Sequence, residues 1–178
     1  MELLSVIIET ERLILKPISY DFAENIFNEF SEEIAIYMVP KPAKHIDETN
    51  IFIKHSLKGL EDGVNLQMII LNKKSNEFIG CISINDIGKI DPELGIWLKK
   101  TSHKSGYGLE AMNELIKWAN ENIEFEYLKY SVDKRNISSI KIAEKNNGKI
   151  MREYKNTGMG GNELEYLEYW IYPKIDKV

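Results

Sequence analysis

The sequence predicts a mixed α/β fold, in which a central sheet of about seven mostly antiparallel strands carries helices on its faces. Three observations predict it. Strand-like segments outnumber helical ones and often follow each other directly, which favours antiparallel pairing. One helical pattern lies between two strand-like segments within residues 93–132, which predicts a single right-handed βαβ crossover with parallel strands. A length of 178 residues, 43% of them apolar, suits a single domain over residues 1–178.

The first half of the chain is expected to form a strand, two helices and a hairpin. Pro17 ends the strand, and Ser19 or Asp21 can cap the first helix. Asp47 or Thr49 can start the second helix. The face of that helix expected to pack inward carries Ile51, Phe52, His55 and Leu60. The expected bounds are residues 10–16 for the strand, 19–30 and 47–62 for the helices, and 66–71 and 78–84 for the hairpin.

The second half is expected to supply the crossover and the last strands. The helix of the crossover places Leu109, Met112, Ile116 and Ala119 on one face. A later short helix stops at Asn147-Gly148, a pair typical of a left-handed C-terminal cap. The expected bounds are residues 93–98, 125–132, 149–154 and 164–172 for the strands and 107–122 and 136–146 for the helices.

Charge and cysteine usage exclude several classes of protein. The net charge of −5 argues against a nucleic-acid-binding protein. No apolar run reaches the length of a membrane span, so no membrane partner is expected. Cys81 is the only cysteine, so an internal disulfide is impossible, and a reducing, cytoplasmic compartment is the natural interpretation. Cys81 lies in a strand-like run without a nearby histidine, which favours a small buried residue over a nucleophile.

One short segment is basic although the chain is acidic. Lys99, Lys100, His103 and Lys104 lie within six residues that contain no acidic side chain. Such a patch suits either a small anionic ligand or a solvated loop.

The glycines that follow this patch favour the anionic ligand. Gly106-Tyr107-Gly108 opens a helix directly after a strand and the basic loop. Unpaired N–H groups at a helix start attract phosphate, and glycines let the backbone approach it. Lys104 can add a charge and Ser105 a hydroxyl donor. The alternative is a flexible helix start capped by Ser105.

Two nucleotide-binding motifs do not fit this loop. A P-loop needs Gly-Lys-Ser/Thr after the last glycine, whereas Leu109-Glu110 follows here. Residues 106–111 match the dinucleotide pattern G-x-G-x-x-A, but Glu126 begins the next strand instead of ending it. Gly95 indicates a bulge or a close backbone approach in the preceding strand. A pyrophosphate at the loop with an amide-bearing arm along that strand, as in coenzyme A, would use both features.

At this point the sequence resembles the GNAT family of N-acetyltransferases. Residues 103–108 occupy the family signature [Q/R]-x-x-G-x-[G/A], with His103 in place of Gln or Arg. Three further segments are similar to the branch of ribosomal-protein N-terminal acetyltransferases of the Rim type: residues 10–15, 93–98 and 136–148. The resemblance spans residues 9–173 and implies a GNAT-like sheet.

The resemblance also implies how acetyl-coenzyme A, the cosubstrate, is bound. Backbone groups of Ile96, Trp97 and Leu98 should hold pantetheine, and Asn136 should contact the same arm or act as a plain N-cap. The residues expected around the pyrophosphate are His103, Lys104, Ser105, Gly106, Tyr107, Gly108 and Leu109. No metal is expected.

For catalysis, the resemblance implies direct attack of an amine on the acetyl group. Glu93 is the candidate base, with a surface acid at a strand end as the alternative. Ser139 matches a family serine near the thioester sulfur, or simply bonds to the backbone of its helix. N–H groups at the expected bulge near Ile96 or Trp97 could stabilise the oxyanion. Ala143 stands where many relatives carry a tyrosine acid, and Ser131 where some carry a glutamate base.

The acceptor is expected to be a cationic amine. A protein or peptide N-terminus is favoured, and a polyamine or aminoglycoside is the alternative. The acidic and aromatic residues that suggest a cation are Glu29, Glu32, Glu33, Glu163, Glu165, Glu168, Tyr166, Tyr169 and Trp170. A strand with one wet face and one core face explains the last six better. A non-catalytic acyl-coenzyme A-binding module and a nucleotide-dependent oxidoreductase remain as alternatives. A monomer or a homodimer is expected.

Overall fold

The computed structural model describes residues 2–173, which form one open sheet flanked by helices. The strands are β1 (Ile8–Glu9), β2 (Leu13–Pro17), β3 (Leu66–Asn72), β4 (Phe78–Asn85), β5 (Glu93–Leu98), β6 (Leu128–Asp133), β7 (Lys149–Thr157) and β8 (Glu163–Ile171). The α-helices are α1 (Ala23–Glu29), α2 (Glu32–Ala35), α3 (Ile46–Glu61), α4 (Tyr107–Asn122) and α5 (Ile137–Lys145), with 3₁₀ turns η1 (Tyr20–Phe22) and η2 (Lys100–Ser102).

The sheet has the predicted mixed character. Its eight strands follow the order β1-β2-β3-β4-β5-β6-β8-β7, and every neighbouring pair is antiparallel except β5–β6. The parallel pair is joined by α4, which confirms the crossover. Two short elements, β1 and α2, were not predicted, because two-residue and four-residue segments are too short to show a period.

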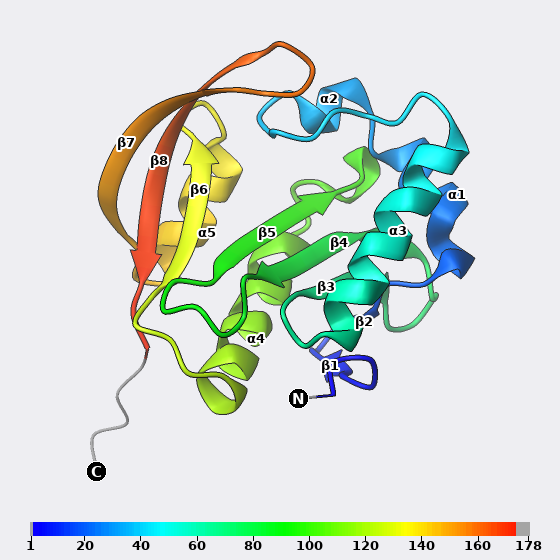
Figure 1. Ribbon diagram of the computed structural model, residues 1–178, viewed down its shortest axis with the longest axis horizontal. Coiled ribbons are helices and arrows are strands. Elements are labelled where there is room, and N and C mark those ends of the chain that lie inside the picture. Colours follow the sequence, from blue (N-terminus) through cyan, green and yellow to red (C-terminus); the bar gives the residue numbers. More distant parts are fainter. Residues whose placement is uncertain (1, 174–178) are drawn as a thin grey trace.

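Helices cover both faces of the sheet (Figure 1): α1 and α3 lie on one face, and α4 and α5 on the other. The inward face predicted for α3 is wrong in part, since Ile51 and Phe52 are 54% and 41% exposed. The buried stripe is instead Thr49, Ile53, Ser56 and Leu60. An apolar pattern does not reveal this stripe, because two of its members, Thr49 and Ser56, are polar. No helix in residues 2–173 is long and apolar enough to cross a membrane.

The parallel strands β5 and β6 pair only at their N-terminal ends. Their one register pair is Glu93 with Lys129, and the Lys129 N–H donates to the Pro92 carbonyl (2.8 Å). Beyond this pair the two strands diverge (Figure 1). The edge of β5 that faces β6 is therefore open over most of its length.

The other edge of β5 is fully paired with β4. Register is continuous from Gly80 with Leu98 to Asn85 with Glu93, so the bulge expected near Gly95 is absent. The glycine instead allows a close approach, since a Cβ on Gly95 would lie 2.9 Å from Ser83 Oγ. The opening beside β5 thus arises from strand divergence and not from a bulge.

The β7–β8 hairpin reaches across the top of the molecule to the segment after α2 (Figure 1). The Met159 N–H donates to the Val39 carbonyl (2.7 Å), and Asn162 Nδ2 donates to the Ile36 carbonyl (3.0 Å). Close to the tip, the Glu165 N–H donates to the buried carboxylate of Asp133, at the end of β6 (3.1 Å). The hairpin tip is therefore tied to the N-terminal half of the sheet.

The close contact between β4 and β5 is testable at Gly80. An added Cβ would lie 2.1 Å from the Trp97 carbonyl oxygen, which is backbone and cannot move aside. We expect Gly80→Ala to lower the free energy of unfolding by about 1–3 kcal/mol, the usual cost of overpacking. Urea unfolding followed by tryptophan fluorescence measures it. Gly160→Ala is the control, since its Cβ would meet no atom closer than 3.5 Å; equal midpoints for the two variants would contradict the expectation.

Candidate active site

The loop between β5 and α4 presents a row of unused backbone donors. Lys104 and Gly106 both adopt positive φ angles, of 62° and 79°, and α4 begins at Tyr107. Within the described residues, the N–H groups of 104–109 donate to no protein acceptor. The N-cap of α4 is Gly106, and the Ser105 hydroxyl donates to the His103 carbonyl (3.4 Å) instead of capping the helix. Six consecutive free N–H groups at a helix start form a site for an anion.

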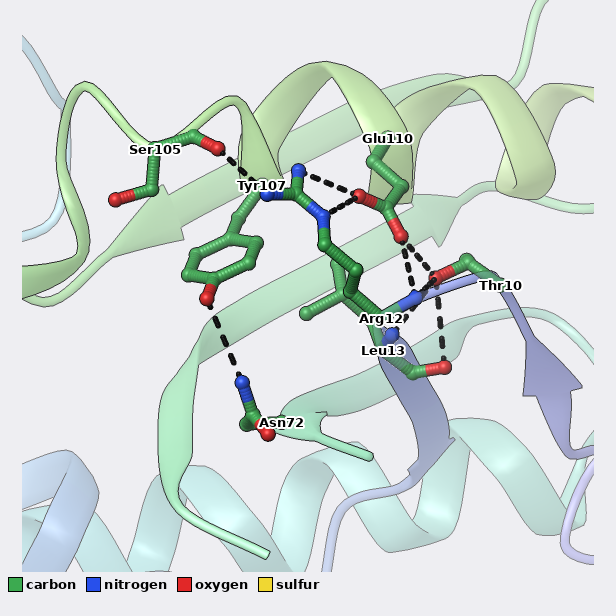
Figure 2. Close-up of polar contacts among 7 residues, drawn as sticks. All are labelled: Thr10, Arg12, Leu13, Asn72, Ser105, Tyr107 and Glu110. Carbon is green, nitrogen blue, oxygen red and sulfur yellow. Dashed lines mark hydrogen bonds and ion pairs between the residues drawn. The ribbon is translucent and has the colours of Figure 1, made fainter. Parts of the chain in front are cut away.

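Two side chains of the loop serve to hold it in place. His103 Nε2 lies 3.0 Å from the Leu98 carbonyl oxygen, which can only accept, so this nitrogen carries the proton. Tyr107 accepts a long hydrogen bond from Asn72 Nδ2 (3.4 Å; Figure 2). The ring of His103 therefore ties the loop to the end of β5.

Gly108 permits close packing behind the loop. A Cβ there would lie 3.2 Å from the Ile142 side chain and 3.5 Å from that of Leu98. The absence of a side chain brings the start of α4 against α5 and β5. Leu109, the next residue, is half-buried.

The backbone of β5 directs alternate residues to the opening. The Lys99 N–H donates to the Ile79 carbonyl of β4 (2.8 Å), so in an antiparallel pair the odd-numbered residues of β5 bond to β4. The N–H and C=O groups of Ile96 and Leu98 therefore point toward β6, where they face the opening. Those of Trp97 point to β4 and are used within the sheet.

Asn136 and Ser139 lie together at the start of α5, on the far side of the opening. Asn136 Oδ1 accepts a hydrogen bond from the Ser139 N–H (3.2 Å), so Asn136 is the N-cap of α5. The Ser139 hydroxyl shares a hydrogen bond with that of Tyr130, a buried residue of β6. Burial raises the pKa of Tyr130 to about 12, against the opposing effect of Ser139. Ala143 is fully buried behind them.

A pocket of about 540 Å³ opens on the opposite face of the sheet, beside α1 and α3. Its floor carries polar side chains of β3, β4 and β5: Gln67, Ser83, Asn85 and Glu93. Its walls are mostly apolar and come from α1, α3, the loop after α2 and the tip of the β7–β8 hairpin: Phe27, Phe30, Met38, Pro40, Phe52 and Met159. Trp97 completes the wall and packs against Phe30, with ring centroids 5.0 Å apart.

Glu93 lies where the pocket meets the point of strand divergence. Lys129 is its register partner on β6 and is bonded to Asp91 (3.0 Å). Burial lowers the pKa of Lys129, but the hydrogen bond and charge of Asp91, with the charges of Glu93 and Glu168, raise it overall. Burial, with smaller effects that include the Glu93 charge, raises the pKa of Tyr166 to about 12.

Sequence reasoning missed two features of this site. It named Glu168 among the acids that could attract a cationic acceptor, but the side chain is buried opposite Ser131 and accepts from Trp170 Nε1 (2.8 Å). It also did not connect Glu48, on α3, with Glu93, because 45 residues separate them. Helical and strand periods reveal which residues are buried, but not which distant elements meet.

All six acids proposed to attract a cationic acceptor lie outside the pocket. Glu29, Glu32, Glu33, Glu163, Glu165 and Glu168 are absent from its lining. Glu33 pairs with Lys100, and Glu165 pairs with Lys134. The pocket carboxylates are Glu48 and Glu93. Cys81 is buried, as expected, and burial raises the pKa of its thiol.

The candidate site thus combines free backbone donors at a helix start, an open strand edge beside them and a pocket on the opposite face of the sheet. Among residues 2–173, no group of three or more His, Cys, Asp or Glu residues is arranged to hold a metal ion. Residues 12–149 match the model of the acetyltransferase (GNAT) domain. This match covers well over half of the chain, which therefore belongs to the GNAT acetyltransferases, a family of acyltransferase enzymes.

Solved structures share the fold at low sequence identity. The ribosomal-protein-S5-alanine acetyltransferase of Vibrio fischeri superposes with a TM-score of 0.83 at 17% identity, over 98% of this chain and 100% of that one. A Salmonella typhimurium acetyltransferase that modifies the N-terminal serine of ribosomal protein L7/L12 superposes with a TM-score of 0.81 at 16% identity, over 96% of this chain and 100% of that one. The Vibrio cholerae spermidine N-acetyltransferase, solved with coenzyme A and spermine, superposes with a TM-score of 0.79 at 14% identity, over 90% of this chain and 95% of that one. No curated protein sequence is significantly similar to this chain.

Proposed function

We propose that the chain is an acetyl-coenzyme A-dependent N-acetyltransferase that acts on primary amines, with a protein or peptide N-terminus as the favoured acceptor. The observation that carries the proposal is the run of unused N–H groups over residues 104–109, next to the open edge of β5. Both features suit one ligand with a pyrophosphate and an amide-bearing arm. The Vibrio cholerae spermidine enzyme, which shares the fold, was solved with coenzyme A.

The residues that would hold the cosubstrate lie along one continuous path. The pyrophosphate would contact the backbone of His103, Lys104, Ser105, Gly106, Tyr107, Gly108 and Leu109. Ile96 and Leu98 would pair with the pantetheine amides, while Trp97 would contribute its side chain to the acceptor pocket. When bound, the thioester supplies the acetyl group. The side-chain amide of Asn136, whose oxygen already caps α5, would present its NH₂ to the same arm.

Glu93 is proposed to take the proton of the attacking amine, directly or through a water molecule. Its side chain lines the pocket and stands at the edge where β5 and β6 separate. Ile96 lies three residues after Glu93 on β5, and its N–H points into the opening. This N–H would donate to the oxyanion. Ser139, held by Tyr130, would donate to the departing thiolate, whose ordinary pKa of about 8.5 makes a strong acid unnecessary.

The pocket supports an amine that carries an apolar group. Polyamines carry several positive charges, whereas the lining offers the carboxylates of Glu48 and Glu93 alongside the cation of Lys41. The aromatic and methionine walls would gain free energy from burying an apolar side chain next to the amine. A peptide N-terminus has one positive charge and a neighbouring side chain, so it matches this lining better than spermidine does.

An acceptor panel tests the proposal. Thiol release from acetyl-coenzyme A should occur with peptides that have a free N-terminus and an apolar first or second residue, with a higher kcat/KM than with spermidine or an aminoglycoside. The same peptides with acetylated N-termini are the control. Coenzyme A binding without turnover of any amine would favour the non-catalytic acyl-coenzyme A-binding module that Ala143 leaves open.

A substitution at Gly106 tests the phosphate loop. We expect Gly106→Glu to abolish coenzyme A binding in calorimetry, because a carboxylate would stand beside the phosphates at a position with φ of 79°. Gly106→Ala is the matched control: it introduces the same backbone strain without charge and should bind more weakly than wild type but measurably. Wild-type affinity in the glutamate variant would exclude this loop as the site.

A substitution at Glu93 tests the base. Glu93→Gln should lower kcat by roughly a hundredfold, at the low end for the loss of a general base, and leave coenzyme A affinity unchanged. Glu48→Gln is the control, since that carboxylate lies on the pocket wall and should affect mainly the KM of the acceptor. Full kcat in Glu93→Gln would remove this residue as the base and direct attention to the buried Glu168.

A further inference from the structure

One arginine from the far end of the sheet holds the phosphate loop and the first turn of α4 together. Arg12 precedes β2 and lies 93 residues before Ser105 in sequence. Its Nη1 donates to the Ser105 carbonyl (3.1 Å), and its guanidinium carbon lies 4.6 Å from the centroid of the Tyr107 ring (Figure 2). A Cβ on Gly106 would lie 3.4 Å from Arg12 Nη2. A single side chain therefore contacts Ser105 and Tyr107 and lies beside the space that a side chain on Gly106 would enter.

Glu110, in the first turn of α4, holds the same guanidinium through an ion pair. Arg12 Nε and Nη2 both donate to Glu110 Oε2 (2.7 Å each). Glu110 Oε1 accepts from the Thr10 hydroxyl (2.5 Å) and the Arg12 N–H (2.8 Å), as Figure 2 shows. Burial raises the pKa of Glu110, but the hydrogen bonds from Thr10 and Arg12 and the Arg12 charge lower it overall, so the pair is ionised near neutral pH.

The loop needs such support because it supports itself poorly. The N–H groups of 104–109 donate to no acceptor within the described residues, and Lys104 adopts a left-handed conformation that costs a non-glycine residue free energy. Besides the packing behind Gly108, the loop is braced by the ring of His103, the long Tyr107–Asn72 hydrogen bond and the two contacts of Arg12. Among these, only Arg12 links the loop backbone, its aromatic ring and the first turn of α4 at once.

We propose that Arg12 is a positioning residue for acetyl-coenzyme A: held by Glu110 and Thr10, it keeps the N–H groups of residues 104–109 aimed at the pyrophosphate. The inference rests on the proposed function. Arg12 does not need to touch the ligand, because its charge is taken up by Glu110 and its free donor holds the Ser105 carbonyl. Lysine cannot replace it, since one ammonium group cannot serve Glu110 and Ser105 and also stack on Tyr107.

The test compares two cosubstrates that differ in the pyrophosphate. Arg12→Lys should weaken coenzyme A binding about tenfold, the size expected for losing a charged hydrogen bond. The KM for acetyl-coenzyme A should rise in parallel, with kcat at saturation unchanged. The KM for S-acetylpantetheine, which lacks the pyrophosphate and nucleotide, should not change. Lys58→Ala, which removes an exposed cation paired with Asp62 on α3, should change none of these values.

Two results would overturn the inference while leaving the proposed function intact. One is wild-type coenzyme A affinity in Arg12→Lys. The other is an equal rise in KM for both cosubstrates, which would indicate a general structural role. If Arg12→Lys does not fold, Glu110→Gln replaces it, because glutamine has the same size but binds the Arg12 guanidinium more weakly. This variant should raise the KM for acetyl-coenzyme A by a smaller factor and leave the KM for S-acetylpantetheine unchanged. A wild-type protein that binds no coenzyme A would instead overturn the proposed function and the inference with it.

Discussion

The arrangement of the site depends on one constraint: β5 and β6 are joined at Glu93 and Lys129 and separate beyond that pair. Backbone N–H and C=O groups at an open strand edge take their partners from water, another chain or a ligand. The divergence leaves both groups of the half-buried Ile96 and the N–H of Leu98 facing the opening, whereas the Leu98 carbonyl accepts from His103. The N–H groups of residues 104–109 lie beside them and are also unused by the described residues. Under the proposed function, an extended amide chain that ends in phosphates would complete both sets at once.

The loop of free N–H groups and the pocket lie on opposite faces of the sheet. α4 and α5 lie on one face and frame residues 104–109, whereas the pocket with Glu93 lies on the face that carries α1 and α3. If the proposed function holds, the cosubstrate and the amine would approach from these two faces and meet where β5 and β6 part. Glu93 stands at this point, and the N–H of Ile96 lies just beyond it.

The solved relatives indicate which part of this arrangement is general. Enzymes named for ribosomal proteins and for spermidine share this fold at 14–17% identity. The common scaffold therefore does not by itself fix the acceptor among these enzymes. In this chain, the pocket in which we propose the acceptor binds is walled by side chains of α1, α3, the loop after α2 and the β7–β8 tip. The contacts of Met159 with Val39 and of Asn162 with Ile36 keep these separate segments together.

By itself, the sequence determined the order of the longer elements, the single crossover, the position of the glycine loop and the family. These follow from local patterns: strand and helix periods, turn residues, and glycines at a helix start. Only the tertiary structure decided that β5 is open through divergence and not through a bulge, and that the Trp97 backbone bonds to β4 while its side chain lines the pocket. It also decided that Glu168 is buried and that Arg12 reaches Ser105. The physical reason is that these facts concern pairing and packing between segments up to about a hundred residues apart, which no local period encodes.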